Sequence, residues 1–266
     1  MKLYWHELLA LRRDISTWSL TLAAIIILFM GLFPVFKNSP TDIAAILAGF
    51  PDTVKDLFGF TNIKLNHLSG YYPFVVKTAI EIGIIGAFIL GAKVINKETH
   101  RKTADFLFSK PISRTMILRE KLLALITATV IINLVFIFAA CLMSALVAPG
   151  EVALRPLVMT SASVFFLMLL YNVWGMLVGI FFPKFKGIIA IAIASLFVFH
   201  ILYEVLLVAF GSENPYARWL IPFLYFDREA IMLTARYDPG ILLFWGGQII
   251  LFCGLGFWQN KRRDLL

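Results

Sequence analysis

Long apolar runs make up most of the chain, and short polar segments separate them. A helix needs about 20 apolar residues to cross the hydrocarbon core of a bilayer. Six runs reach or approach this length: residues 16–36, 72–95, 122–147, 157–182, 187–210 and 241–258. The pattern predicts an all-α integral membrane protein whose six transmembrane helices form a single domain over residues 1–266.

A different pattern precedes the first run. Trp5, Leu8, Leu9 and Ile15 fall on roughly one face of a helix over residues 2–16, and the charged side chains fall elsewhere. A helix with one apolar and one charged face typically lies in the plane of the membrane surface. We therefore expect an amphipathic interfacial helix before the first span.

Lysine and arginine are unevenly distributed among the connecting segments. An even number of spans puts both chain ends on one side of the membrane, and cytoplasmic loops carry an excess of positive charge. Of the 24 Lys and Arg residues, 16 fall in or beside the two termini and the segments after the second and fourth runs. The other eight belong to the opposite side, where Lys77 lies inside the second run and the rest are spread over longer loops. Both termini and residues 96–121 are therefore predicted to be cytoplasmic.

Composition agrees with a lipid environment and narrows the class of partner. Hydrophobic residues are 60% of the chain and charged residues only 15%, which leaves too little polar surface for a soluble protein of this size. The net charge of +8 is also found in nucleic-acid-binding proteins. Here the surplus falls in the predicted cytoplasmic segments, where anionic headgroups balance it. We expect membrane lipid, and no nucleic acid, as its partner.

The densest cluster of charge lies between the second and third runs. Residues 103–110 can form a short helix whose apolar part is Phe106, Leu107 and Phe108, before Pro111 changes the chain direction. Ser113 can then cap a new helix that continues into the third run. This segment is open to two interpretations: a basic loop that obeys the charge rule, or a docking element for a soluble partner.

The same segment resembles a known family. Its sequence ETHRKTADFLFSKPISR, residues 98–114, is similar to the signature between the second and third spans of type-2 ATP-binding-cassette exporter permeases. One position departs from that signature, because Lys102 stands where the family usually has glycine. The positions that match are Glu98, Thr103, Asp105, Leu107, Ser109, Pro111, Ile112, Ser113 and Arg114.

The resemblance implies a coupling helix that docks on a separate ATPase subunit, which the N-terminal helix would also touch. ATP and magnesium would bind on that partner, and two permease chains, identical or related, would pair around the transport path. It also implies a multi-pass protein of the cell membrane of a bacterium or an archaeon. The residues expected to dock are Glu98, Thr103, Asp105, Phe106, Leu107, Phe108, Ser109, Pro111, Ser113 and Arg114.

The chain has no convincing ATPase motif of its own. Its nearest match to a phosphate-binding loop, GAFILGAK at residues 86–93, has Ala92 in place of the required lysine and lies inside a span. Close helix packing explains the glycines better, because small residues recur every four positions in this run. No zinc motif or catalytic set is present, so we expect a transport subunit without a cofactor or metal, and not an enzyme.

Besides Lys93, near the predicted cytoplasmic end of the second run, four charged or histidine residues lie inside predicted spans. Lys77 and Glu81 are one helical turn apart in the second span, and His200 and Glu204 are one turn apart in the fifth, all in the outer half. They could be structural pairs near the headgroups, or they could line a substrate path or outer gate. Two other classes remain open: a membrane-embedded enzyme, or a proton-coupled secondary transporter, that uses Glu81, His200 and Glu204.

Overall fold

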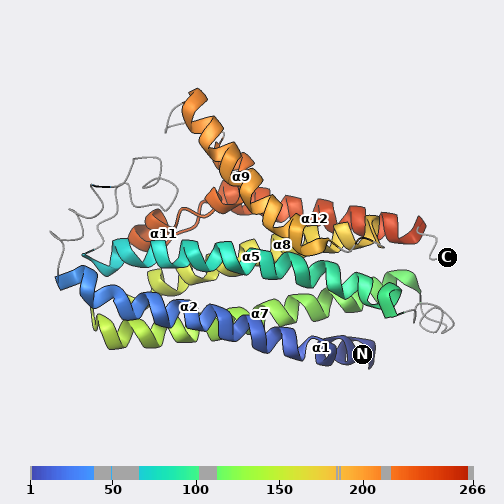
Figure 1. Cartoon of the computed structure of the whole chain (residues 1–266), viewed down its shortest axis with the longest axis horizontal. Helices are drawn as coiled ribbons and strands as arrows, with labels where there is room; N and C mark the ends of the chain where they lie inside the picture. The colour runs from blue at the N-terminus through green and yellow to red at the C-terminus, as the bar shows by residue number, and fades with distance from the viewer. Residues whose placement is uncertain are drawn as a thin grey trace.

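The computed structural model describes residues 2–38, 49, 66–101, 113–183, 185, 187–210 and 217–262, with residues 2 and 98–101 described for their backbone only. In this part of the chain, six helices are long and apolar enough to cross a membrane, which confirms the expected all-α fold with six spans (Figure 1). They are α2 (Arg12–Asn38), α5 (Leu68–Arg101), α7 (Arg114–Val147), α8 (Leu154–Phe181), α9 (Ile188–Phe210) and α12 (Pro239–Arg262). The shorter elements are α1 (Lys2–Ala10), α10 (Ala217–Leu220), the 3-10 helix η1 (Pro222–Leu224) and α11 (Arg228–Thr234).

Two of the spans are much longer than the apolar runs that predicted them. α5 and α7 contain 34 residues each, a length of about 51 Å against the roughly 30 Å of a bilayer core. α5 continues past the expected end at residue 95, and α7 begins at Arg114, before the third apolar run and directly after the predicted cap Ser113. Hydropathy marks the part of a helix that lies in lipid, whereas Glu, Lys and Arg sustain a helix beyond it.

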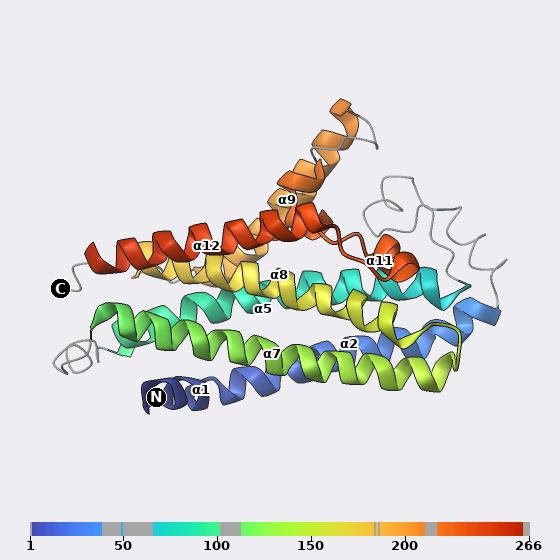
Figure 2. The same ribbon diagram turned by 180° about the vertical axis from the view of Figure 1, so that it is seen from behind.

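Four of the spans form the main bundle. α2, α5, α7 and α8 lie side by side along the long axis of the molecule, and α12 packs along α8 (Figures 1 and 2). Their facing side chains make one apolar core, in which Ile26, Ile80, Ile132 and Met168 are almost completely buried. α1 and the end of α12 lie at the same end of the bundle, as an even number of spans requires. We call it the terminal end, and the other the distal end.

Glycine permits the closest helix contact in the bundle. A Cβ atom added to Gly91 of α5 would overlap the Asn172 carbonyl of α8, and one added to Gly175 of α8 would overlap the Phe88 carbonyl of α5. The two backbones therefore touch without side chains between them. The small residues in these spans were predicted to mark a close contact, and the structure confirms it.

The fifth span is attached to the bundle along only part of its length. α9 leans away from the other helices, and its far half projects from the molecule (Figure 1). Along this helix Ala192 is the one buried residue. The Phe199 ring stacks on Trp174 of α8, with ring centroids 5.8 Å apart. Most of α9 therefore presents an apolar surface to its surroundings.

A carboxylate joins three segments at the distal end. Glu151, between α7 and α8, binds the Lys37 ammonium at 2.5 Å and accepts a hydrogen bond from the Leu68 backbone N–H at 3.3 Å. Burial raises the pKa of the Glu151 carboxyl, but Lys37 and the Leu68 N–H outweigh that effect, so the net pKa lies below the ordinary value. The contact thus fixes the ends of α2 and α5 to the α7–α8 connection.

Candidate functional site

Most of the predicted docking segment lies outside the described residues. Of Glu98 the structure describes only the helical backbone, at the end of α5. The expected docking residues that are not described are Thr103, Asp105, Phe106, Leu107, Phe108, Ser109 and Pro111. Their role therefore stays a prediction, and the helices on either side of them carry the structural evidence.

The described end of the segment begins a helix as predicted. Ser113 has an extended backbone, and its Oγ accepts a hydrogen bond from the Met116 N–H at 3.2 Å, so it is the N-cap of α7. The Arg114 carbonyl accepts a hydrogen bond from the Asn260 side chain at 3.3 Å. The start of α7 is therefore anchored to the end of α12.

A buried ion-pair cluster joins α1, α5 and α7 near the described ends of α5 and α7, and the sequence did not reveal it. The Glu7 carboxylate of α1 lies 2.6 Å from the Lys97 ammonium of α5 and 3.3 Å from the Lys121 ammonium of α7. Lys121 also donates to the Val94 carbonyl at 2.7 Å. Glu7 is 1% exposed and Lys121 is 4% exposed, so the charges are held away from water. We call Glu7, Lys97 and Lys121 the basal triad.

The basal triad corrects the expected orientation of the N-terminal helix. The prediction placed Glu7 on the polar face, but the structure turns this residue into the bundle and leaves Trp5 59% and Leu9 60% exposed. The helix also ends at Ala10, and α2 starts at Arg12. The missed signal is the spacing of Tyr4, Glu7 and Leu11, which share a second helical face.

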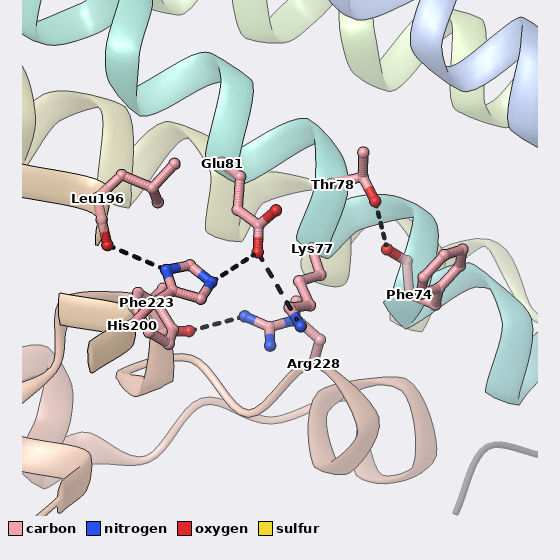
Figure 3. Close-up of polar contacts among 8 residues, drawn as sticks. All are labelled: Phe74, Lys77, Thr78, Glu81, Leu196, His200, Phe223 and Arg228. Carbon is pink, nitrogen blue, oxygen red and sulfur yellow. Dashed lines mark hydrogen bonds and ion pairs between the residues drawn. The ribbon is translucent and has the colours of Figure 1, made fainter. Parts of the chain in front are cut away.

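A second polar cluster joins α5 and α9, and it contains three of the four predicted gate residues (Figure 3). The Glu81 carboxylate lies 4.0 Å from the Lys77 ammonium and 3.4 Å from His200 Nε2. The side chains of Lys77, Glu81 and His200 are largely shielded by the protein, and none of them is completely buried. We call these three residues the interhelical cluster.

One of the two alternatives for these residues, structural pairs within each span, does not describe His200. His200 Nδ1 lies 3.0 Å from the Leu196 carbonyl, and Nε2 faces Glu81 of α5 instead of Glu204 one turn away. Glu204 is half-buried and lies close enough to Lys77 to act on its charge. The four residues are therefore grouped around α5, an arrangement that spacing along one helix cannot show.

Arg228 is a further member of this region that the sequence did not single out. It begins α11, and its guanidinium points toward Glu81 and Lys77 (Figure 3) while it donates to the Phe223 carbonyl at 2.8 Å. Burial lowers the pKa of Arg228, although Asp227 and Glu81 oppose the shift. An arginine stays protonated at neutral pH. The short α11 thus adds a fixed positive charge beside the interhelical cluster.

The bundle core also contains polar side chains that the sequence pattern did not single out. Asn172 of α8 donates to Thr129 Oγ1 of α7 at 2.7 Å, and the Tyr72 hydroxyl of α5 meets Ser161 Oγ of α8 at 2.5 Å. These side chains are all buried. Polar residues within otherwise apolar runs were the available signal, because such groups find partners on neighbouring helices.

The residues that resembled a phosphate-binding loop are helical. Residues 86–93 lie within α5, and Lys93 pairs with Asp14 of α2 at 2.7 Å. A phosphate-binding loop requires a turn whose successive N–H groups point at the ligand, and a continuous helix does not supply it. This stretch therefore serves helix packing and an ion pair.

Comparison with known proteins gives one match that covers nearly the whole chain. A comparison with curated proteins found no significant match. The family model described as ABC-2 family transporter protein matches residues 1–265. This match extends far beyond the charged segment that first pointed to such a family, and it includes all six spans. The chain therefore belongs to the ABC-2 family of transporter proteins and is an ABC-2 type permease, a multi-pass membrane component of a transport system.

Proposed function

We propose that this chain is the membrane-spanning subunit of an ATP-driven exporter whose ATP and magnesium bind on a separate ATPase subunit. Two permease chains, identical or related, would enclose the transport path in the cell membrane. The basal triad is the observation that best supports this assignment, because it sits where α5 and α7 leave the bundle toward residues 102–112. Those residues contain most of the predicted docking side chains.

The helices are connected in a way that would transmit a force from this segment. One carboxylate, Glu7, binds both Lys97 and Lys121, so a push on the segment would move the ends of α1, α5 and α7 together. α5 in turn touches α8 backbone to backbone at Gly91 and Gly175. Closely packed interiors shift as rigid bodies instead of deforming continuously. The displacement would therefore reach the distal half of the bundle.

The interhelical cluster is our candidate for the outer gate. Lys77, Glu81 and His200 lie between α5 and α9 (Figure 3), and Glu204 follows His200 by one turn on α9. The Glu81–His200 contact is a polar link between the two helices. Charged groups within a span are costly unless they are paired or hydrated, which favours a functional role. Breaking and remaking this contact would let α9 swing relative to α5.

Co-purification tests the docking assignment directly. The chain would be expressed with a candidate ABC ATPase subunit from the same genome. Phe106→Asp and Phe108→Asp should each abolish the association of the two proteins, because a charge replaces an apolar anchor. Leu233→Asp is the matched control, since Leu233 is 77% exposed in α11 near the distal end. Full retention of the ATPase by both phenylalanine variants would contradict the proposal.

Transport assays separate the gate from the docking role. In proteoliposomes that contain the permease and the ATPase subunit, Glu81→Gln should slow the ATP-driven export of the substrate. The permease and the ATPase should remain associated. Export at the wild-type rate would remove the gate and leave the docking proposal intact. Transport that needs a pH gradient and no ATP would instead support the proton-coupled alternative.

A further inference from the structure

A cationic groove lies at the terminal end of the bundle, and Glu7 and Lys97 of the basal triad form part of its wall. It has a volume of about 470 Å³ and opens between the α1–α2 junction and the last turns of α5. In Figure 1 this is the region where α1 and the start of α2 lie below the end of α5. The residues that line it are His6, Glu7, Leu9, Ala10, Leu11, Arg12, Arg13, Asp14, Lys93, Val94 and Lys97.

The charges of the groove do not cancel. Its two carboxylates are already engaged, Glu7 by the basal triad and Asp14 by Lys93 at 2.7 and 2.8 Å. Arg12 and Arg13 are exposed, and within the described part of the chain neither guanidinium has an ion-pair partner. Four Lys and Arg side chains thus face two acids, which leaves a surplus of two positive charges in a concave site.

The position of the groove matches the level of phospholipid headgroups. Arg12 and Arg13 open α2, immediately before its long apolar stretch, so their side chains lie where that helix would leave the hydrocarbon core. Leu9 borders the groove and is 60% exposed, and Trp5 on the same short helix is 59% exposed. Exposed tryptophan and leucine beside basic side chains are typical of a surface that contacts both acyl chains and headgroups.

We propose that this groove binds the phosphate of an anionic phospholipid from the cytoplasmic leaflet, with Arg12 and Arg13 as its principal ligands. Arginine suits this role because its planar donors match phosphate oxygens in a bidentate manner. Lys93 and Lys97 line the same wall and offset the charges of Asp14 and Glu7, so the surplus positive charge is that of Arg12 and Arg13. The inference depends on the predicted orientation of the terminal end toward the cytoplasm, and it does not depend on ATP coupling.

Native mass spectrometry of the full chain in detergent tests the site, with dioleoylphosphatidylglycerol as the anionic probe and dioleoylphosphatidylcholine as the neutral one. The double variant R12Q/R13Q should bind phosphatidylglycerol roughly 10- to 30-fold more weakly than the wild type, since each basic side chain near the surface contributes a few-fold in affinity. R12K/R13K retains the charge and should recover part of the loss. Phosphatidylcholine binding should be unchanged in all proteins.

The control removes the same amount of charge elsewhere at the terminal end. K261Q/R262Q alters the last turn of α12, where the Arg262 guanidinium lies 4.2 Å from the centre of the Trp258 ring. It should change phosphatidylglycerol binding less than twofold. An equal loss in both double variants would overturn the proposal, because it would show a general effect of surface charge.

Competition with inorganic phosphate tests whether the groove binds a phospholipid headgroup or a free phosphate ion. At the concentrations that saturate phosphatidylglycerol binding, it should fail to displace the lipid from the wild type, because the acyl chains add affinity that free phosphate lacks. Displacement of the lipid by phosphate, with loss of phosphate binding in R12Q/R13Q, would assign the groove to a soluble anion and overturn the lipid assignment.

Discussion

Replacing Glu7 by glutamine removes the carboxylate that both Lys97 and Lys121 contact in the basal triad. Deleting one partner of a buried ion pair costs about 3–5 kcal/mol, because an uncompensated charge stays buried. Lys121 is 4% exposed and has little access to water. It keeps its hydrogen bond to the Val94 carbonyl, and Lys97 is more exposed, so we expect a loss near 3 kcal/mol.

Thermal unfolding in lipid nanodiscs measures this loss. For a chain of this size 1 kcal/mol corresponds to roughly 2–4 °C, so Glu7→Gln should lower Tm by about 6–12 °C. Asp14→Asn is the matched control, since it breaks the pair with Lys93, whose side chain is 54% exposed. An exposed pair contributes about 0.2–1 kcal/mol, which is at most a few degrees.

A second substitution checks the cause. Adding Lys121→Gln to Glu7→Gln removes the more deeply buried of the two lysine charges and should restore part of the lost stability. Equal decreases in Tm for Glu7→Gln and Asp14→Asn would refute the reasoning. So would a decrease in Tm for the Glu7→Gln/Lys121→Gln double variant that exceeds the sum of the decreases for Glu7→Gln and Lys121→Gln. Either result would mean that the triad is not held away from water.

Two further predictions concern helix contacts away from the triad. Gly91→Ala should destabilise the chain by about 3 kcal/mol, because the new methyl group overlaps the Asn172 carbonyl. Gly247 has open space around it, so the control Gly247→Ala should be neutral or slightly stabilising. Equal Tm values for the two variants would contradict the close contact. Glu151→Gln should lower stability by about 0.2–1 kcal/mol at pH 7. The pKa of Glu151 is lowered in the folded state, so the stability difference between wild type and Glu151→Gln should persist at pH values above the unfolded-state pKa of about 4.3 and disappear as the pH falls below it. A stability difference that stays constant from pH 7 to pH 3 would contradict a stabilising Glu151–Lys37 pair.

Residue pattern was enough to predict several features of the fold. Spacing of apolar runs located the six spans, and Ser113 with the preceding proline marked the start of α7. Recurrent small residues located the contact at Gly91 and Gly175. These features follow from local rules, because a helix cap and a glycine contact each depend on residues only a few positions apart.

Other features depend on which helices become neighbours. His200 bonds Glu81 on α5 instead of Glu204 on its own helix, and α11 brings Arg228 beside them. Neither contact follows from helical spacing, since the residues are more than a hundred positions apart or belong to different elements. Only the packing of α5 against α9 and α11 brings these charges together.

The sequence by itself determined how many helices cross the membrane, where both chain ends lie relative to each other, and which family the charged segment resembles. The tertiary structure decided which face of each helix meets protein and which meets lipid. In water a polar face identifies the outside of a helix, but lipid is as apolar as a protein core, so hydropathy does not separate the two surfaces. Glu7 shows the consequence, because its charge is turned inward against Lys97 and Lys121 while Trp5 and Leu9 face outward.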